Sequence, residues 1–361
     1  MRWPALLLAC AGCDAVFALD PPPGAPDAWL AGSHAFRKQL VITPPTRQPL
    51  IDFPVGVVLA SDADLADAAQ PDAGDLVFTA DDGTTTLDHE LERYVASTGE
   101  LVAWVRVPEL AGTTTLYVYY GGPPVPATDT PWTDAYGAVW HLGGASVASE
   151  PDSTRHGNTL SAGTADAPGS VAGVAGLARS FDGDGDELTA TDHATLDVID
   201  PGGSLTYSLW VNAGMPLGDY DSPLGKGGNR AENAGYVIQL GRGMWTTSIA
   251  DGDEDQRIVR LGDDGALAGW AHLAVVVDRT HAELRAYVNG ESIGHTTLDS
   301  FGSFASDFDL ALSPEVDPFR GVVDEVRIVH AALSAVWLQT EHANLVDLDF
   351  LRVGGEELRP R

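Results

Sequence analysis

The chain has 361 residues, of which 52 are acidic and 20 are basic, so its formal net charge is −32 at pH 7. Such an acidic chain repels nucleic acid and anionic membrane surfaces, which excludes both as binding partners. The only two cysteines, Cys10 and Cys13, lie near the N-terminus, so packing rather than disulfides must stabilise the body. The many glycines and prolines favour short strands joined by turns, and the length suggests two domains.

The first 13 residues combine Arg2, a short apolar run and small residues before Cys13. This pattern is typical of a secretory signal, and the run is shorter than the about 20 apolar residues that span a bilayer. The segment resembles a bacterial lipoprotein signal, in which a cysteine becomes the lipid-bearing N-terminus. The resemblance implies a lipid-anchored protein of the bacterial cell envelope, with Cys13 as the attachment site. Acylation at Cys10, a soluble signal cut after Ala11 and an unprocessed N-terminus are the alternatives.

Residues 14–33 are rich in proline and predict a semi-extended spacer. A first domain is expected over 34–125, with strands at 53–59, 75–79, 101–107 and 114–120. Along 101–107, apolar residues alternate and place Leu101, Ala103, Val105 and Val107 on one face. Such period-2 patterning between turn signals predicts a β-sandwich.

A second linker is expected over 126–136 and a second domain over 137–361, with strands at 137–142, 204–211, 235–240, 270–278 and 283–288. The last of these runs into Asn289-Gly290, a strong hairpin signal. Ser334 predicts the N-cap of a short C-terminal helix that ends near Asn344. The predicted fold class is all-β, with two β-sandwich domains in tandem.

The first domain resembles the bacterial extracellular domain of unknown function DUF2341 in its Phe53-Pro-Val, Asp75-Leu-Val-Phe-Thr, Leu101-Val-Ala-Trp-Val-Arg-Val-Pro108 and Thr114-Thr-Leu-Tyr-Val-Tyr-Tyr-Gly121 stretches. The second resembles a LamG-like, concanavalin A-like jelly roll in Val139-Trp-His-Leu, Phe181-Asp-Gly183, Ser204-Leu-Thr-Tyr-Ser-Leu-Trp-Val211, Tyr287-Val-Asn-Gly290 and Gly321-Val-Val-Asp-Glu-Val-Arg-Ile328. The second resemblance implies two packed antiparallel sheets. It is shared by carbohydrate binders, adhesive modules and some glycoside hydrolases, so the fold alone does not choose among them.

A calcium site is a further hypothesis. Members of the LamG-like family often hold a calcium ion, and residues 182–187 offer four carboxylates with two glycines. The resemblance implies a structural Ca²⁺ with Asp182, Asp184 and Asp324 as candidate metal ligands. The alternative is a solvated acidic turn together with a hydrogen-bonded core aspartate.

Strand 322–328 carries an unusual acid. Period 2 puts Asp324 on one face with Val322, Val326 and Ile328, so its carboxylate should be buried and needs an arginine, backbone amides or a metal. Glu325 and Arg327 are expected on the other face as a solvated ion pair.

No catalytic residue is predicted. Residues 251–255 read as an acidic surface loop, and the histidines lack the close spacing typical of zinc sites. Trp104, Tyr117 and Tyr119 lie opposite the predicted core face, where they would stack on sugars or join the two domains. We expect a non-catalytic binding protein whose partner is a polysaccharide or, alternatively, an envelope protein; a divergent glycoside hydrolase is the third possibility. Its only contact with membrane is expected to be the lipid anchor.

Overall fold

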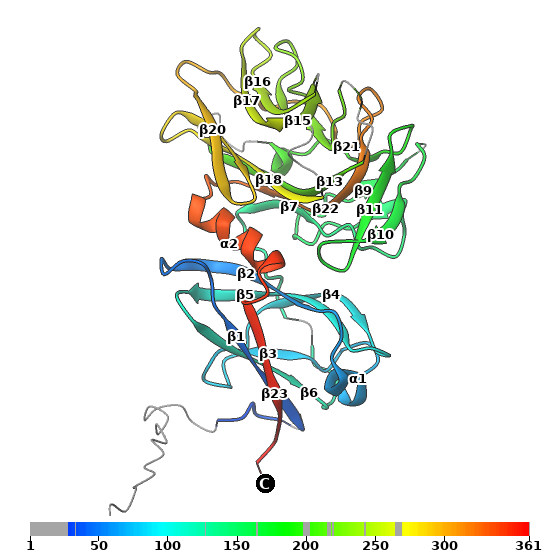
Figure 1. The fold of residues 1–361 in the computed structure, drawn as a ribbon, viewed down its shortest axis with the longest axis vertical. Helices are drawn as coiled ribbons and strands as arrows, with labels where there is room; N and C mark the ends of the chain where they lie inside the picture. Colours follow the sequence, from blue (N-terminus) through cyan, green and yellow to red (C-terminus); the bar gives the residue numbers. More distant parts are fainter. Residues whose placement is uncertain are drawn as a thin grey trace, which may run out of the picture.

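The computed structural model describes residues 28–32, 34–126, 128–163, 165–197, 203–214, 218, 220–241, 243–263 and 269–360. The predicted signal, with Cys10 and Cys13, lies outside these residues. The described chain forms two β units stacked along the long axis of the molecule (Figure 1).

The first unit is a sandwich of two small sheets. Sheet A has the strand order β23-β1-β6-β3 and sheet B has the order β2-β5-β4. Leu101, Ala103, Val105 and Val107 all enter its core, as their alternation predicts. The elements of this unit are β1 (Phe36–Ile42), β2 (Leu50–Leu59), α1 (Ala63–Ala68), β3 (Val77–Thr79), β4 (His89–Val95), β5 (Glu100–Leu110), β6 (Thr114–Tyr120) and β23 (Leu351–Leu358).

The C-terminal strand belongs to this first unit. β23 pairs antiparallel with β1, from Phe36 opposite Leu358 to Ile42 opposite Leu351. The expectation that the second domain runs from 137 to 361 is therefore wrong for its last strand. Without β23, one edge of β1 would expose its backbone groups, so the two ends of the described chain complete one sheet.

The second unit is a jelly roll of two antiparallel sheets, which confirms the all-β fold class. Among the described residues, sheet C has the order β10-β11-β22-β13-β18-β19-β20 with β7 beside β22, and sheet D has the order β17-β16-β15-β14-β21-β12-β9-β8. Its elements are β7 (Tyr136–Trp140), β8 (Ser149–Glu150), β9 (Leu160–Ser161), β10 (Gly169–Ala172), β11 (Leu177–Asp182), β12 (Leu188–Ala190), η1 (Ala194–Leu196), β13 (Leu205–Ala213), β14 (Leu224–Lys226), β15 (Gly235–Gly241), β16 (Met244–Ala250), β17 (Gln256–Asp263), β18 (Trp270–Asp278), β19 (Glu283–Val288), β20 (Glu291–Thr297), β21 (Leu310–Leu312) and β22 (Arg320–Val329).

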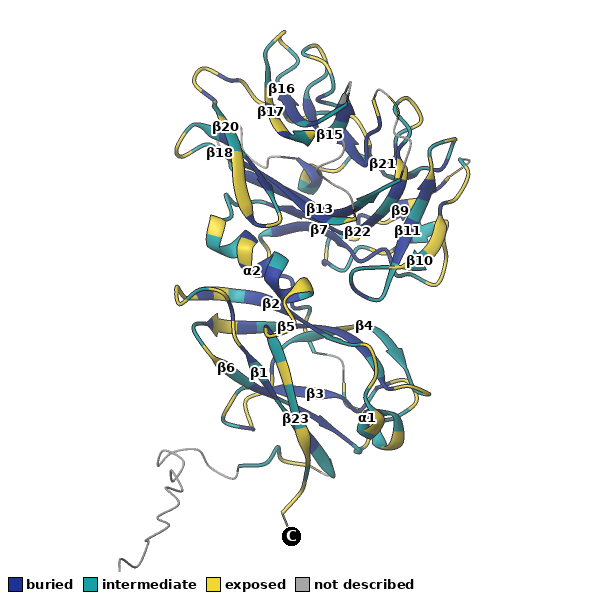
Figure 2. Ribbon diagram, viewed as in Figure 1, coloured by how far each residue is buried: buried dark blue, intermediate teal, exposed yellow. Residues whose placement is uncertain are grey.

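Sheets C and D pack face to face around one large apolar core. Trp140, Tyr207 and Trp245 are among its fully buried side chains. The predicted hairpin is present at Asn289-Gly290, where both residues have positive φ angles of 53° and 77°, as the tight turn between β19 and β20 requires. Figure 2 shows the central strands of sheet C buried along most of their length.

Helix α2 (Ala335–Val346) lies between the two units (Figure 1). Its N-cap is Ser334, as predicted, and the Ser334 hydroxyl accepts a hydrogen bond from the Trp337 amide at 3.1 Å. Near its other end, the Asn344 side chain accepts from the Gly56 amide and donates to the Gly56 carbonyl, both at 2.8 Å. These two hydrogen bonds therefore attach the helix to β2 of the first unit.

The described parts of the two predicted linkers pack against the body. Trp29 lies edge-on against Tyr119, with ring centroids 5.3 Å apart. Trp132 is 1% exposed and donates from Nε1 to Glu90 at 2.7 Å. Trp132 is therefore part of the contact between the units, so the predicted linker over 126–136 is packed against the body at this residue.

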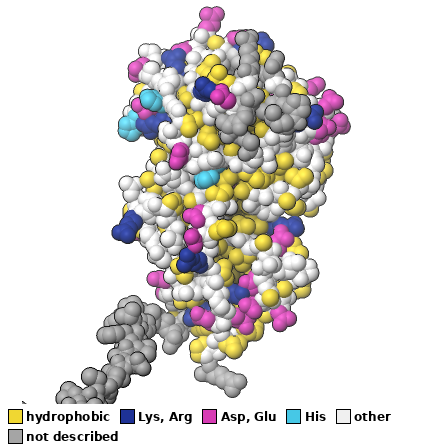
Figure 3. Space-filling view, viewed as in Figure 1, with side chains coloured by type: hydrophobic (Ala, Val, Ile, Leu, Met, Phe, Trp, Pro, Cys, Tyr) yellow, Lys and Arg dark blue, Asp and Glu magenta, His cyan; other side chains and the backbone are white. Residues whose placement is uncertain are grey.

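The surface is consistent with the acidic composition. On the face shown in Figure 3, acidic side chains are dispersed over both units with basic ones between them. Within the described residues, neither helix has the length and hydropathy that crossing a membrane would take.

Candidate functional site

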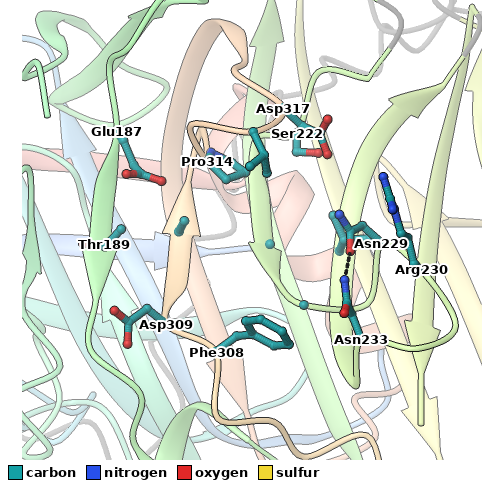
Figure 4. A pocket seen from close by; sticks show the side chains of 15 residues that line it. Glu187, Thr189, Ser222, Asn229, Arg230, Asn233, Phe308, Asp309, Pro314 and Asp317 are labelled. Carbon is teal, nitrogen blue, oxygen red and sulfur yellow. Dashed lines mark hydrogen bonds between the residues drawn. The ribbon is translucent and has the colours of Figure 1, made fainter. Parts of the chain in front are cut away.

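The outer face of sheet D contains a pocket of about 610 Å³ (Figure 4). Its floor is a row of short side chains that crosses neighbouring strands: Thr189 pairs with Ala311, Ala311 with Gly225, and Gly225 with Val237. Because side chains alternate along a strand, the neighbours of these residues point into the core. The row leaves a shallow channel across the sheet.

The walls of the pocket come from loops at both ends of these strands. Phe308 stands on one side and is 48% exposed, and Val316 on the loop after β21 is 78% exposed. Asn229 and Asn233 face the channel from the turn between β14 and β15. The side-chain Nδ2 of Asn233 donates to Oδ1 of Asn229 at 3.1 Å (Figure 4). The pocket thus combines an exposed aromatic ring with side-chain amides.

A glycine-rich turn positions these amides. Gly227 and Gly228 have φ angles of +68° and +73°, and a Cβ on Gly227 would lie 2.1 Å from the Ala234 carbonyl oxygen. Only glycine fits this tight return of the chain. The amide of Gly228 donates to the Asn233 carbonyl at 2.9 Å and closes the turn.

Three carboxylates and one arginine line the pocket: Glu187, Asp309, Asp317 and Arg230. The backbone amides of Glu315 and Asp192 donate to Glu187 at 3.0 Å and to Asp309 at 2.8 Å. Burial raises the pKa of Asp317, although Asn229 and Arg230 act in the opposite direction. The lining is therefore acidic overall, and its carboxylates are held in place by neighbouring donors.

The proposed calcium ligands do not meet in one site. Asp182 and Asp184 lie on an exposed turn, where the Asp182 carboxylate accepts from the Asp184 amide at 2.8 Å. Asp182 is opposite Arg320, which is four residues from Asp324 along β22, a separation of about 13 Å. The grouping of Asp182 and Asp184 with Asp324 is wrong for this geometric reason. Calcium binding at the turn alone stays a prediction.

Asp324 is fully buried, as predicted, and its partners are backbone amides. Its carboxylate accepts from Val174 at 2.8 Å and from Ala175 at 3.2 Å. Burial raises the pKa of Asp324 well above its ordinary value, and the charges of Glu325 and Glu92 act in the same direction.

The expected period-2 pattern of β22 is broken by a β-bulge. Ser208 pairs with Arg327 but Trp210 pairs with Asp324, so one residue of β13 opposes two residues of β22. Val323, Val326 and Ile328 consequently face the core, whereas Val322 does not. The expectation of a solvated Glu325–Arg327 pair is wrong, because both side chains are buried where sheet C meets the first unit.

These residues belong to a buried charged group between sheets B and C, here called the interface cluster. Its members are Glu90, Glu92, His141, Asp324, Glu325, Arg327 and Glu341. Arg327 donates to Glu325 and to Glu341, both at 3.0 Å, and its guanidinium lies 4.6 Å from the centre of the Trp104 ring. Trp104 is 1% exposed, so it joins the two units and is not a sugar platform.

Burial decides the pKa shifts of some members of the interface cluster, and charged neighbours decide those of others. It raises the pKa of Glu92 to about 8 and also raises the pKa of Glu341. Burial alone would raise the pKa of Glu325, but His141 and Arg327 lower it below its ordinary value. Burial alone would lower the pKa of His141, but the charges of Glu325 and Glu92 raise it well above its ordinary value.

Sequence reasoning missed both the pocket and the interface cluster. The glycines of the Gly225-Lys-Gly-Gly-Asn229 stretch were the one local signal of the pocket. Glu92, His141 and Glu325 come from three separate strand regions, and no spacing rule relates them.

Comparison with protein-family models identifies both domains. Residues 72–135 match the domain of unknown function DUF2341, and residues 182–339 match the concanavalin A-like lectin/glucanases superfamily. The chain therefore carries a DUF2341 domain followed by a concanavalin A-like domain. The search of curated proteins found no match.

The comparison with solved structures found matches at low identity. The binding domain of Paraclostridial Mosquitocidal Protein 1 is 12% identical with a TM-score of 0.49, and the match covers 59% of this chain and 53% of that chain. The binding domain of botulinum neurotoxin serotype G is 12% identical with a TM-score of 0.45, covering 57% and 50%. The chain thus spans about half the length of these solved chains.

Proposed function

We propose that this is a non-catalytic binding protein whose pocket on sheet D binds a neutral saccharide. The observation that carries the proposal is the row of short side chains at Thr189, Ala311, Gly225 and Val237 beneath the exposed ring of Phe308. An aromatic face packs on the apolar face of a sugar ring, while amides and carboxylates bond its hydroxyl groups. The pocket volume of about 610 Å³ lies within the usual range for small ligands.

Charge narrows the ligand class. Three carboxylates face one arginine in the lining, within a chain of net charge −32. Such a field repels uronic acids and sulfated glycans. The geometry and the charge of the pocket together support a neutral polysaccharide as the ligand.

The decisive variant is Gly225→Leu. A Cβ at Gly225 meets only a Val237 methyl group at 3.5 Å, and the residue has no positive φ, so the strand accepts a side chain that fills the channel. On a glycan array, we expect wild type to bind neutral glycans, and Gly225→Leu and Phe308→Ala to bind at least about tenfold more weakly, or about 1.4 kcal/mol.

The matched control is Ile258→Ala. Ile258 lies on β17 of the same sheet and is 56% exposed, but it does not line the pocket. Its removal should leave glycan binding unchanged. A blank array for wild type contradicts the proposal and favours an envelope protein as partner. Release of sugar products that Asp317→Asn abolishes would show a glycoside hydrolase instead.

The proposal includes a lipid anchor at Cys13 on the bacterial envelope. It is supported by the small residues before Cys13 and by the absence of cysteine from the rest of the chain after it. Intact-mass analysis of the native N-terminus should find an acylated Cys13, and Cys13→Ser should leave the membrane fraction. An unmodified Met1 at the N-terminus would contradict it.

A structural calcium ion at the Asp182–Asp184 turn remains part of the proposal, supported by its exposed carboxylates. Addition of Ca²⁺ to chelator-treated protein should raise the melting temperature of wild type but not that of the Asp182→Asn, Asp184→Asn double variant. An equal response of both proteins, or of neither, would contradict this site.

A further inference from the structure

Three metal-binding side chains from the two units converge at the domain interface. Glu92 is on β4 of the first unit, His141 directly follows β7, and Glu325 is on the bulge of β22. One donor atom from each lies within 4.8 Å of the other two. His141 Nδ1 is 2.8 Å from Glu325 Oε1 and 3.6 Å from Glu92 Oε2.

The 2.8 Å separation is that of a hydrogen bond, and both separations also fit a metal coordination sphere. Around a tetrahedral ion with bonds of about 2.0–2.1 Å, neighbouring ligand atoms lie about 3.3 Å apart. The observed separations of 2.8 and 3.6 Å lie on either side of this value. We propose that Glu92, His141 and Glu325 bind one divalent transition-metal ion, which joins the DUF2341 domain to the jelly roll.

An unpartnered buried atom supports this assignment independently of the clustering. Glu92 Oε1 has no hydrogen-bond partner among the described residues, although the Glu92 side chain is 4% exposed. A buried polar atom without a partner is costly and rare in folded proteins. Glu92 and His141 also line a cavity of about 170 Å³, which has room for a water molecule as a further ligand.

Neighbouring groups hold the three ligands in orientation. Trp104 Nε1 donates to Glu92 Oε2 at 2.9 Å, and Arg327 donates to Glu325 Oε2 at 3.0 Å. Glu90 Oε2 lies 3.5 Å from His141 Nε2, on the opposite side of the ring from Nδ1. A carboxylate behind a metal-bound imidazole and donors behind metal-bound carboxylates are the usual outer partners of such sites.

The charge of the interface cluster also favours a cation. Its five acids, Glu90, Glu92, Asp324, Glu325 and Glu341, face Arg327, His141 and His272, whose Nε2 lies 4.0 Å from Glu341 Oε2. Buried charge is tolerated when it is paired or coordinates a metal. A divalent ion offsets the acid excess where the two units meet.

The donor set selects the class of ion. One imidazole nitrogen with carboxylate oxygens suits Zn²⁺, Mn²⁺ or Fe²⁺, whereas Ca²⁺ takes six to eight oxygen ligands. The ion takes the place of the hydrogen bond between His141 Nδ1 and Glu325 Oε1, so that both atoms become ligands. The inference does not depend on the saccharide pocket, which is on the other sheet.

The test uses the full chain, freed of metal by a chelator and titrated with Zn²⁺ in a calorimeter at pH 7. We expect one ion bound per chain and a higher melting temperature. Co²⁺ in place of Zn²⁺ should give the visible absorption of a four-coordinate site. Folded wild type that binds no Zn²⁺ would overturn the proposal.

Two substitutions test the ligands. His141→Gln removes the imidazole, and Glu92→Gln keeps an oxygen for Trp104 while removing the charge, so it preserves the packing if His141→Gln fails to fold. Each should weaken Zn²⁺ binding by at least about tenfold and abolish the Co²⁺ spectrum.

The matched control is the Asp182→Asn, Asp184→Asn double variant, which removes exposed carboxylates elsewhere and should bind Zn²⁺ like wild type. Zn²⁺ affinity that is unchanged in folded Glu92→Gln would refute the site. Glycan binding by wild type before and after chelation separates this inference from the proposed function.

Discussion

The two outer faces of the jelly roll differ in what covers them. The outer face of sheet C is covered by sheet B and α2, and it carries the interface cluster. The outer face of sheet D carries short residues beneath exposed loops. Both faces belong to the same sandwich, and along each strand the outward side chains alternate with side chains that enter the same core.

The difference shows how the surroundings of a strand set the energetic role of its polar residues. On sheet C, the charged groups are desolvated, so each depends on a partner such as the Arg327–Glu325 pair. On sheet D, polar groups such as Asn229 keep access to water and are available to a ligand. The first face holds the molecule together, and the second is the candidate binding surface.

Breaking the covered face should have the largest effect. Arg327→Met leaves Glu341 buried without its cation and leaves Glu325 with His141 alone, so it should cost about 3–5 kcal/mol of unfolding free energy. Urea unfolding followed by tryptophan fluorescence measures this. Arg352→Met is the control, because the Arg352–Asp349 pair is 70% and 79% exposed and should contribute under about 1 kcal/mol. Equal losses in the two variants would contradict the comparison.

Removing the hydrogen bonds between α2 and β2 should cause the next largest loss of stability. Asn344→Ala leaves the buried amide and carbonyl of Gly56 without partners and should cost about 2–3 kcal/mol in the same assay. Asn233→Ala is the control, since its hydrogen bond to Asn229 lies in a partly exposed turn and should contribute about 1 kcal/mol or less. A loss for Asn344→Ala no greater than that of the control would show that the hydrogen bonds between Asn344 and Gly56 do not stabilise the interface.

Acid should also weaken the covered face. Burial lowers the pKa of His272 to about 3, and the charges of Arg327 and His342 act in the same direction. The unfolded chain takes up this proton near pH 6.5 and the folded chain does not, so stability falls as pH drops from 6.5 towards 3. The expected contribution is about 1.4 kcal/mol for each pH unit well below 6.5.

The measurement for His272 is the free energy of unfolding between pH 8 and pH 5 for wild type and His272→Gln. At pH 8 the imidazole is neutral in both states, so the difference there reports packing alone. The variant should lose less stability on acidification. Parallel pH profiles would show that His272 does not contribute to acid sensitivity.

The open face should give the smallest effect on stability. Gly225→Leu adds a side chain to the floor of the pocket without a close contact, and it removes the backbone freedom of a strand glycine. The free energy of unfolding should stay unchanged or rise by up to about 1 kcal/mol. Thermal unfolding beside the glycan assay would test this, and a loss above about 1 kcal/mol would mean that this face is packed rather than open.

Local sequence patterns predicted the strands and the helix correctly where those patterns were regular. Alternation in residues 101–107 and 114–120 predicted β5 and β6, and Ser334 predicted the start of α2. The pattern failed at β22, because a bulge at Glu325 and Val326 shifts the face of every residue before it. The pairing of β23 with β1 was also missed, since strands so far apart in sequence leave no local sign of their partnership.

By itself, the sequence determined the all-β class, the order of the two domains and the acidic surface, because periodicity and composition are local properties of the chain. Only the tertiary structure decided which face of the jelly roll is covered, and therefore that Glu325 and Arg327 are buried while Gly225 faces an open channel. Burial depends on what packs above a strand, and a strand's own residues do not encode that neighbour. Strand register separates Asp182 from Asp324, and the packing of the two units brings Glu92, His141 and Glu325 together.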